Sequence, residues 1–263
     1  MGTINIPDLD ACHYANHSKA QYDRVQKLIK PIEINHTSSV LDVGCGFGNI
    51  IAEISQMAIN GNSIGIDASL NMIELAKREF PKSRFPNLEF HYMKAEDISF
   101  PENSFDIVLC TNMLLWVRKA KQALKLMSKC LKKGGLLIIL TYPNDTPYAQ
   151  LFDQVLKKYF FSFSKFSAAD TMISEEAHVQ TLIQEGINLE SVCSKEVLFT
   201  YKSQDDLKNY VKGWLNCYVP LPLELQELFL DKVAEESLLF NISNKENEII
   251  IPHRILTIKG RKS

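Results

Sequence analysis

The sequence predicts an α/β protein with a doubly wound, mostly parallel seven-stranded sheet and a helical cap inserted near its C-terminal strands. Between Ser39 and Tyr142, short β-branched apolar runs alternate with longer amphipathic segments, a pattern typical of βαβ units around a covered parallel sheet. After Pro143 the pattern becomes mainly helical, with two further strand-like runs. Neither a repeat nor a long linker divides the 263 residues, so we expect a single domain.

The first part of the chain predicts five strands and the helices that connect them. Apolar runs predict strands at residues 39–43, 63–67, 88–93, 105–110 and 136–142. Helices are expected at 49–59, 70–80 and 120–132. Ser69 is placed to cap the second of these helices, and Gly134-Gly135 suits a left-handed cap at the end of the third.

The second part predicts four helices and two strands. The helices are expected at residues 148–163, 174–186, 203–218 and 221–238, and the strands at 189–201 and 247–260. Our interpretation is that the two strands complete the same sheet, while the helices form a cap over its carboxyl edge. The aromatic residues between Tyr159 and Phe166 either line a tunnel or pack in a core, and Trp214 and Tyr218 share one helix face.

Composition excludes several classes of partner. The chain is 46% hydrophobic and 23% charged, with a formal net charge of -2, so it has a core but no general basic field for nucleic acid. No signal peptide is recognisable, and no apolar run approaches the length of a membrane helix. We therefore expect a cytoplasmic protein without a membrane span, and the oligomeric state stays open.

The cysteines predict neither a metal site nor a disulfide framework. All six are scattered singly, without a C-x-x-C pair or a histidine at ligand spacing. Cys110 and Cys130 lie in apolar patterns and are expected to be core residues.

The segment VLDVGCGFGN, residues 40–49, is the main candidate for ligand binding. It places Gly44, Gly46 and Gly48 between a predicted strand and a predicted helix, where missing Cβ atoms let a ligand approach free backbone N–H groups. The spacing differs from the G-x-G-x-x-G pattern of dinucleotide-binding proteins, which argues against NAD. The alternative is that this segment forms a tight strand-to-helix turn that binds no ligand.

The pattern D-x-G-x-G-x-G resembles the first motif of the class I S-adenosylmethionine-dependent methyltransferases, and matches in the same order extend over residues 36–145. The resemblance implies a Rossmann-like fold, S-adenosylmethionine as cofactor and S-adenosylhomocysteine as product. It implies that Asp67 hydrogen-bonds the ribose, that Asp97 and Glu96 lie at the adenine, and that residues 111–113 lie beside the methionine end. The implied cofactor-binding residues are Asp42, Gly44, Cys45, Gly46, Asp67, Ala68, Met72, Glu96, Asp97, Thr111, Asn112 and Met113.

Two flanking segments bear on the methyl acceptor. YANHSKAQYDRVQKLI and LLWVRKAKQALKLMSKCLKKGG look like the juvenile hormone acid and trans-aconitate methyltransferases, with Tyr14 seven residues before Gln21 and a Trp-Val step at Trp116. By that similarity Gln21 and Trp116 contact an acceptor carboxylate. The sequence departs from both groups at Leu115, where they have His or Gln. The resulting expectation is an O-methyltransferase for a small, partly apolar carboxylic acid.

In domain terms, residues 1–35 are expected to form a helical segment over the active site and 36–145 the cofactor-binding core. Residues 146–240 would form the cap, with a sheet strand near 189–201, and 247–260 the last strand. A carboxylate acceptor needs no general base, because a negative oxygen attacks a positively charged sulfonium in one displacement.

Other functions remain open. A quinone, phenol or carrier-bound acceptor would need a base, for which His13 and His17 are candidates. An inert cofactor-binding protein is the alternative outside enzymes. A nicotinamide-dependent reductase is disfavoured by the glycine spacing.

Overall fold

A seven-stranded mixed sheet forms the centre of the molecule. The computed structural model describes residues 10–166, 172–219 and 221–263. The strand order is β3-β2-β1-β4-β5-β7-β6, in which β1 to β5 are parallel and β7 runs antiparallel between β5 and β6. The bounds are β1 Ser39–Val43, β2 Asn62–Asp67, β3 Leu88–Tyr92, β4 Phe105–Thr111, β5 Leu131–Thr141, β6 Ile187–Tyr201 and β7 Ile249–Lys262. The predicted α/β fold class and its seven strands are confirmed.

Helices cover both faces of the sheet, as a doubly wound fold requires. Side chains of α2 (Lys19–Ile29), α3 (Asn49–Met57) and α4 (Leu70–Glu79) pack with Val40 and Ile138 on one face. Those of α5 (Ala120–Cys130) and α8 (Glu175–Gln184) pack with Leu41 and Ile139 on the other. Neighbouring strand residues thus point to opposite faces, and both faces are buried. Cys110 and Cys130 are buried on the second face, as predicted.

The connection from α5 to β5 differs from the prediction. The helix ends at Cys130 rather than near Gly134-Gly135, and β5 begins at once with Leu131. Phe105 pairs with Leu131 but Ile107 pairs with Leu136, so residues 132–135 bulge out of the ladder. Gly134, with a φ of 76°, therefore serves a bulge at the strand start, not a helix cap. Ser69 does cap α4, because its side chain accepts a hydrogen bond from the Met72 N–H.

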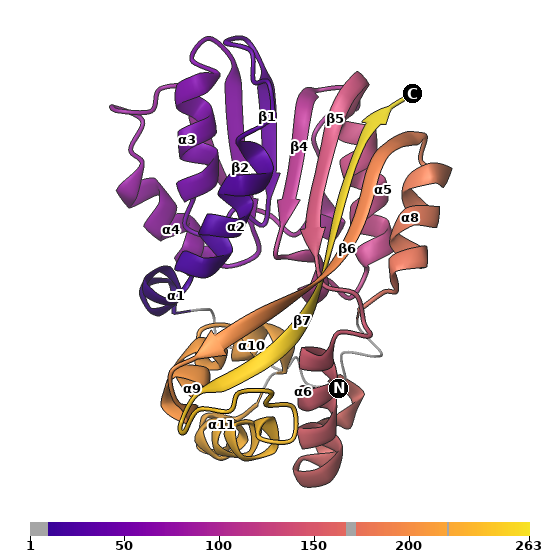
Figure 1. Ribbon diagram of the computed structural model, residues 1–263. Coiled ribbons are helices and arrows are strands. Elements are labelled where there is room, and N and C mark those ends of the chain that lie inside the picture. Colours follow the sequence, from indigo (N-terminus) through magenta and orange to yellow (C-terminus); the bar gives the residue numbers. More distant parts are fainter. Residues whose placement is uncertain (1–9, 167–171, 220) are drawn as a thin grey trace.

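Strands β6 and β7 carry the cap beyond the carboxyl edge of the sheet. Residues 256–261 of β7 pair with both β5 and β6, whereas residues 249–255 pair with β6 alone. Figure 1 shows these two strands running from the sheet into a lower group of helices. That group contains α6 (Pro147–Tyr159), α9 (Gln204–Lys212), α10 (Leu215–Tyr218) and α11 (Leu223–Ser237), with the short helix η3 (Phe161–Phe166) after α6. The cap has its own core, in which Phe152 and Phe229 are fully buried.

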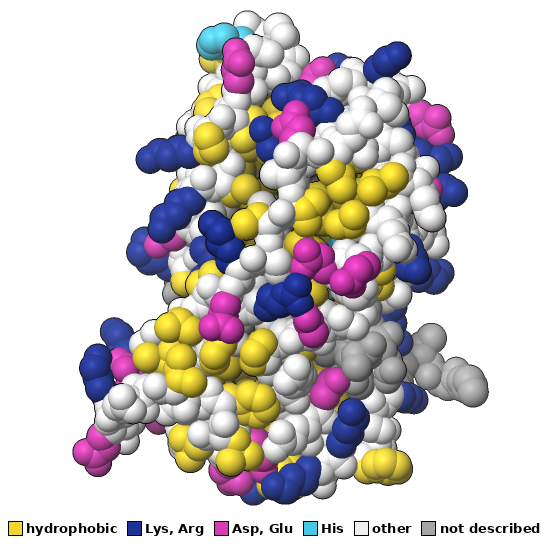
Figure 2. Space-filling view, turned by 45° about the vertical axis from the view of Figure 1, so that its right-hand side comes forward, with side chains coloured by type: hydrophobic (Ala, Val, Ile, Leu, Met, Phe, Trp, Pro, Cys, Tyr) yellow, Lys and Arg dark blue, Asp and Glu magenta, His cyan; other side chains and the backbone are white. Residues whose placement is uncertain are grey.

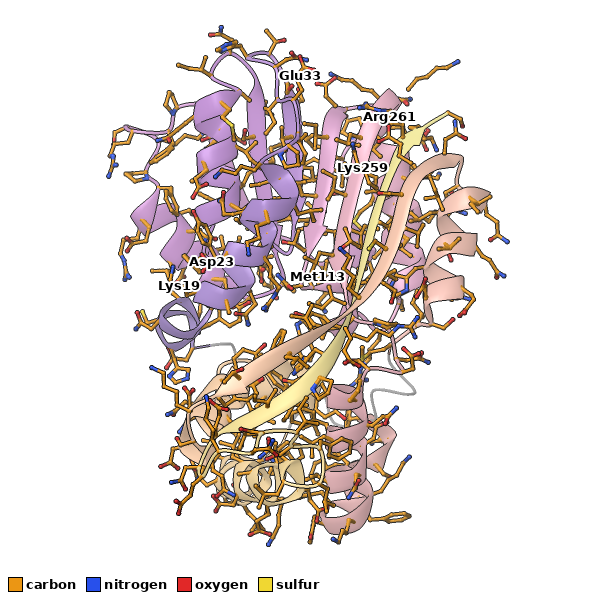
Figure 3. All side chains as sticks on the ribbon, viewed as in Figure 1. Lys19, Asp23, Glu33, Met113, Lys259 and Arg261 are labelled. Carbon is orange, nitrogen blue, oxygen red and sulfur yellow. The ribbon has the colours of Figure 1, made fainter. Side chains whose placement is uncertain are left out.

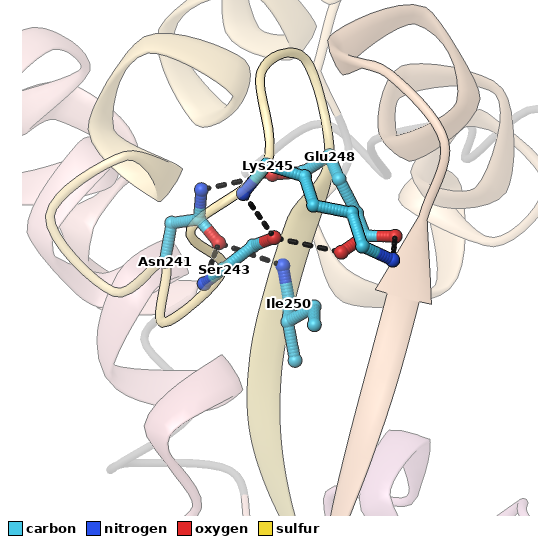
Figure 4. Close-up of polar contacts among 5 residues, drawn as sticks. All are labelled: Asn241, Ser243, Lys245, Glu248 and Ile250. Carbon is cyan, nitrogen blue, oxygen red and sulfur yellow. Dashed lines mark hydrogen bonds and ion pairs between the residues drawn. The ribbon is translucent and has the colours of Figure 1, made fainter.

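A compact polar turn leads from α11 into β7. The Asn241 Oδ1 atom accepts hydrogen bonds from the N–H groups of Ser243 and Ile250, at 2.9 and 2.8 Å. The Ser243 hydroxyl donates to Glu248, which also pairs with Lys245 (Figure 4). These contacts fix the point at which β7 begins.

The surface has mixed charge. On the face shown in Figure 2, acidic and basic side chains are interspersed with apolar groups. Within the described part of the chain, no helix combines the length and apolar character needed to cross a membrane. The same residues contain no group of three or more His, Cys, Asp or Glu side chains arranged to hold a metal ion.

Candidate functional site

The glycine loop after β1 is held against the end of β2. The N–H groups of Gly44 and Cys45 both donate to the Ile66 carbonyl, at 2.8 and 2.9 Å. A Cβ atom at Gly44 would overlap the Met113 side chain, and one at Gly48 would lie 2.6 Å from the Phe90 ring. At Gly46, by contrast, an added Cβ would meet no described atom within 4 Å. Gly44 and Gly48 are therefore required by packing, whereas Gly46 faces open space.

Asp67 links this loop to the start of α4. One carboxylate oxygen accepts the Gly46 N–H and the other accepts the Ser69 N–H, both at 2.9 Å. A carboxylate has about four acceptor positions, so these two bonds leave capacity for further donors. Asp67 is half-buried at the carboxyl end of β2, where parallel sheets of this kind bind ligands.

A cavity that is partly open to solvent lies beside the loop; we call it the cofactor cavity. Its walls come from the loop, the end of β4, α2 and the short helix α1 (Ala11–His17). Of the predicted cofactor residues, six line it: Asp42, Gly44, Cys45, Gly46, Thr111 and Asn112. Met113 packs under Gly44, at the level where the core meets the cap (Figure 3).

Asp42 is a buried acid in the wall of this cavity. The residue is 2% exposed, and its Oδ1 atom has no hydrogen-bond partner among the described residues. Burial, and to a lesser extent the charge of Asp67, raises the pKa of Asp42 to about 7. An acid left without a donor in this way is suited to receive one from a bound ligand, above all from a cation.

Besides Asp67 and Met113, four predicted cofactor residues are not among those that line the cofactor cavity. Ala68 and Asp97 are exposed, and Glu96 is half-buried with its backbone carbonyl accepting from Gln122 at 2.6 Å. The Met93 N–H donates to the Asp67 carbonyl, which holds the segment carrying Glu96 and Asp97 beside the end of β2. Met72 is 1% exposed and packs with Ala11 and Leu75, so it is a core residue in this structure.

A second, narrow cavity adjoins the first; we call it the acceptor cavity. Tyr14, Gln21 and Asn112 line both, so the two spaces meet at these residues. Asn112 adopts a left-handed φ of 58°, and its side-chain oxygen accepts a hydrogen bond from Tyr142 at 3.3 Å. This conformation turns the chain at the end of β4 toward the junction of the cavities.

Gln21 and Trp116, the two predicted acceptor-positioning residues, both line the acceptor cavity. The Gln21 amide donates to the Tyr210 hydroxyl at 3.1 Å, and its Oε1 atom is buried with no partner among the described residues. Trp116 stacks on Trp214, with ring centroids 5.1 Å apart and an interplanar angle of 27°. Leu115, where the sequence departs from its resemblance, lines the same cavity.

Other lining residues were missed by the sequence reasoning. Four of them are widely separated in the chain: Tyr142 follows β5, and Tyr148, Tyr210 and His253 come from α6, α9 and β7. One signal was available, because His253 interrupts an otherwise apolar strand pattern. The tyrosines give no comparable signal, since a buried tyrosine in a helix or strand is ordinary.

Two secondary predictions concern histidines and aromatic residues. The His13 ring bonds the Asn209 carbonyl at 2.9 Å and lines neither cavity, and the His17 side chain lies outside the described part of the structure. The aromatic run after Tyr159 does not line a tunnel: Phe160 packs on Phe229 in the cap core, and Phe161 is 79% exposed.

Trp214 and Tyr218 do face a common space. They border a third, apolar cavity of about 260 Å³ that also shares Leu115, Trp116 and Tyr148 with the acceptor cavity. The acceptor cavity therefore continues into an apolar recess between the core and the cap.

Known proteins share both the sequence pattern and the fold. Residues 41–139 match a family model described as a methyltransferase domain. The candidate methyltransferase 235L of Invertebrate iridescent virus 6 is 24% identical over 225 residues, which cover 85% of this chain and 83% of that protein. The ubiquinone/menaquinone biosynthesis C-methyltransferase UbiE of Geotalea daltonii is 33% identical over 150 residues, covering 53% of this chain and 63% of the enzyme. This chain thus spans less than two thirds of the length of UbiE.

Solved structures agree on the fold. Protein YcgJ of Bacillus subtilis has a TM-score of 0.67 at 17% identity, covering 92% of this chain and 98% of YcgJ. Geranyl diphosphate C-methyltransferase of Streptomyces coelicolor, solved with S-adenosylhomocysteine, has a TM-score of 0.58 at 11% identity, covering 95% of this chain and 82% of that one. The fold is the Rossmann-like methyltransferase fold. The comparisons support a class I S-adenosylmethionine-dependent methyltransferase, while the likeness to juvenile hormone acid and aconitate enzymes stays a prediction.

Proposed function

We propose that this protein transfers the methyl group of S-adenosylmethionine to a small, partly apolar carboxylic acid. The observation that carries the proposal is the meeting of two cavities at Tyr14, Gln21 and Asn112. One cavity lies under a glycine loop with two acids, and the other lies between the core and an aromatic cap. A methyl donor in the first would face an acceptor in the second.

The residues of the cofactor cavity fit a sulfonium nucleoside. The open space at Gly46 lets a ligand approach the loop backbone, and Asp67 retains acceptor capacity for ribose hydroxyls. The unpartnered Asp42 oxygen is suited to the ammonium group of the methionine end, near Thr111, Asn112 and Met113. Ala68, Glu96 and Asp97 lie at the side where the adenine would extend, and Cys45 and Met72 support the walls.

Methyl transfer to a carboxylate requires positioning rather than a base. When bound, the cofactor supplies a methyl group on a positively charged sulfur. A carboxylate oxygen forms the new bond to carbon as the sulfur–carbon bond breaks, leaving a neutral ester and a neutral thioether. Charge is neutralised as the transition state forms, so a pocket that excludes water favours the reaction. Orientation at near-attack distance can supply on the order of 7–11 kcal/mol.

Gln21 and Trp116 are the proposed acceptor-positioning residues. Both line the acceptor cavity, and both have neutral N–H groups that hold a carboxylate without withdrawing much charge from it. No Asp or Glu is among the described residues that line this cavity, so nothing there repels an anion. Burial, with a smaller contribution from Arg24, lowers the pKa of His253 well below its usual value, so this ring is a neutral lining group.

The second candidate acceptor is a quinone or a phenol. The identity to UbiE and the aromatic walls of the acceptor cavity favour it. Such an acceptor must lose a proton to a base, and the His13 ring is bonded to the Asn209 carbonyl outside the cavity. His253 lines the acceptor cavity, but its lowered pKa makes it a weak base, so this candidate has less support than a carboxylic acid. An inert cofactor-binding protein is the remaining alternative.

Two measurements test the proposal. Calorimetry should show binding of S-adenosylmethionine and S-adenosylhomocysteine, which Asp67→Ala abolishes and Asp23→Ala, an exposed acid on α2, leaves unchanged. Methyl-labelled cofactor supplied with fatty, dicarboxylic and isoprenoid acids should then give base-labile methyl esters. Base-stable products alone would favour the quinone or phenol, and binding of NADH in place of both sulfur ligands would exclude the proposal.

A further inference from the structure

The acceptor cavity contains polar atoms that no described group of the protein satisfies. Tyr148 is 7% exposed and His253 1%, yet the Tyr148 hydroxyl and both ring nitrogens of His253 have no partner among the described residues. Their rings lie together, with centroids 4.4 Å apart. Buried polar atoms are nearly always paired in native proteins, so such a group indicates a missing ligand.

These atoms lie away from the place where the methyl group would enter. Tyr14, Gln21 and Asn112 form the boundary with the cofactor cavity, whereas Tyr148 and His253 line the acceptor cavity but not the cofactor cavity. A group bound by Tyr148 and His253 would therefore lie on the side of the acceptor cavity that does not border the cofactor cavity.

The positively charged Arg24 side chain lies behind the part of the acceptor-cavity wall that His253 forms. The Arg24 guanidinium lies 4.2 Å from the Phe199 ring centre, and the His253 ring stacks on the same phenylalanine at 3.7 Å. Two Arg24 nitrogens, Nε and Nη2, are buried without a hydrogen-bond partner in the described structure. Burial raises the pKa of Tyr142, and the charge of Arg24 opposes that rise, which places the guanidinium close to the cavity lining. Arg24 is half-buried and no described acidic side chain forms an ion pair with it, so an anionic ligand would supply the missing counter-charge and partners for its two unsatisfied nitrogens.

We propose that Tyr148, His253 and Arg24 form an anion subsite that holds a carboxylate of the acceptor, at the end remote from the methylated atom. The carboxylate accepts hydrogen bonds from the Tyr148 hydroxyl and one His253 N–H, and Arg24 supplies the compensating charge. A single guanidinium matches the single charge of a carboxylate. Resting on the proposed function, this makes the acceptor a dicarboxylic acid, with the neutral donors Gln21 and Trp116 presenting the second carboxylate to the methyl group.

The separation of the two ends has a chemical reason. A carboxylate paired with a guanidinium has its negative charge drawn toward that cation, and it is a weaker nucleophile than one held by neutral amides. Charge at the remote end selects the acceptor, while neutral donors at the reacting end leave the oxygen reactive. Arg24 is thus a specificity-determining residue rather than a catalytic one.

Calorimetry in the presence of S-adenosylhomocysteine tests the subsite directly. The probes are butanedioate, hexanedioate and 1,4-phenylenediacetate, each compared with its diamide of the same shape. The native protein should bind at least one diacid tenfold or more tightly than its diamide. Arg24→Met should weaken that binding tenfold or more, and Tyr148→Phe a few-fold. Arg84→Met is the matched control, because Arg84 also stacks on a phenylalanine but is exposed and far from both cavities.

The outcomes separate the subsite from the proposed function. If no diacid is preferred to its diamide, or if Arg24→Met binds diacids as the native protein does, the subsite is wrong. Loss of diacid binding in Arg24→Met with unchanged affinity for S-adenosylhomocysteine supports it. Diacid binding that depends on Arg24 but yields no methyl ester would refute the proposed function and leave the subsite standing. If monoacids and diacids are both converted to methyl esters, and Arg24→Met does not change this, the proposed function stands and the subsite is refuted.

A thermal measurement without ligand distinguishes a binding role from a structural one. Because the unpaired guanidinium is destabilising, Arg24→Met should melt at a higher temperature than the native protein. A diacid that binds should raise the melting temperature of the native protein and of Arg84→Met, but not that of Arg24→Met. A lower melting temperature of Arg24→Met, with the diacid effect retained, would show that Arg24 only packs against Phe199.

Discussion

Asp42 carries a carboxyl group that this fold keeps buried without a donor, next to a second acid. Because its pKa is about 7 in the folded protein and 3.8 when unperturbed, the folded state holds the proton more tightly than the unfolded chain does. Its contribution to stability is therefore present below about pH 4 and is lost as pH rises to about 7, on the order of 4 kcal/mol in all. The contribution of Asp42 to stability is therefore least favourable at a pH where its carboxyl group is charged.

Asp42→Asn should remove this pH dependence. At pH 8 the variant should have a higher free energy of unfolding than the native protein, by a few kcal/mol, whereas at pH 4 the two should agree. Its affinity for S-adenosylmethionine at pH 8 should fall about tenfold or more, because a charged partner of the ammonium group is lost. Urea unfolding from pH 4 to 8 and calorimetry check both effects. An unchanged slope of stability against pH would contradict the role given to Asp42, and Asp23→Asn is the exposed control.

Alanine substitutions at Gly46 and Gly134 allow the effect of backbone strain on stability to be separated from the effect of an added methyl group on ligand binding. Both have positive φ, 54° and 76°, and at both an added Cβ meets no described atom within 4 Å. Each alanine substitution should therefore cost a similar 1–2 kcal/mol of stability, roughly. Only Gly46→Ala, whose methyl group faces the cofactor cavity, should also lower cofactor affinity, by about tenfold or more. Equal cofactor affinities in the two variants would place the ligand elsewhere.

For individual residues, the sequence predicts membership of a local motif better than it predicts which residues line a cavity. The glycine loop, Asp42 and Asp67 were predictable because all lie at the ends of β1 and β2, which pair in register. Met72 is predicted to lie at the cofactor, and in the structure its side chain packs in a cluster with Ala11 and Leu75. The outcome for Met72 depends on how α1 packs on α4, which no local pattern specifies.

Among the elements, β7 determines where the cap meets the core. Arg254 lies on this strand next to His253, and its N–H donates to the Thr146 hydroxyl at 2.9 Å. Its side chain pairs with Asp145 and Glu175 and donates to Ser194, which joins β7 to β6, α8 and the start of α6. Half-exposed ion pairs are individually weak, but several on one guanidinium restrain its position.

Arg254→Gln should loosen the cap without disturbing the cofactor loop. We expect the KM for the acceptor to rise several-fold and stability to fall by roughly 1 kcal/mol, while the affinity for S-adenosylhomocysteine stays unchanged. Arg261→Gln is the matched control, because Arg261 pairs with Glu190 near the other end of β7. Steady-state kinetics and calorimetry separate the two substrates. A parallel loss of cofactor affinity would show that Arg254 acts on the whole fold.

The order of strands and helices was predictable because burial imposes a period on each element. The bulge at residues 132–135 was not, since it arises from the register between β4 and β5. The extension of β6 and β7 beyond the sheet was equally hidden, because their pattern is the same whether one partner strand or two are present. The sequence thus predicted the elements and the cap, but not the acceptor cavity between the core and the cap.

In the whole molecule, the acceptor cavity is formed by residues that are far apart in the chain. Gln21 on α2 bonds Tyr210 on α9, and Trp116 after β4 stacks on Trp214 before α10. Both contacts join the core to the cap across the acceptor cavity. The cavity therefore exists only when the two parts are docked, which links acceptor binding to their relative position.

The Trp116–Trp214 stack offers a direct measure of this docking. Trp116→Ala, Trp214→Ala and the double variant form a cycle, and we expect a coupling energy of roughly 0.5–1.5 kcal/mol in unfolding. The same pair should be coupled in kcat/KM for the acceptor but not in cofactor affinity, because neither ring lines the cofactor cavity. Trp116→Phe, which keeps one aromatic ring for the stack but removes the indole N–H together with the second ring, should retain more of the stability than Trp116→Ala and lose activity if that N–H positions the acceptor. Strictly additive losses in stability and in kcat/KM would mean that the two tryptophans are not energetically coupled across the contact between core and cap. In that case we would assign the positioning of the acceptor to Gln21 alone.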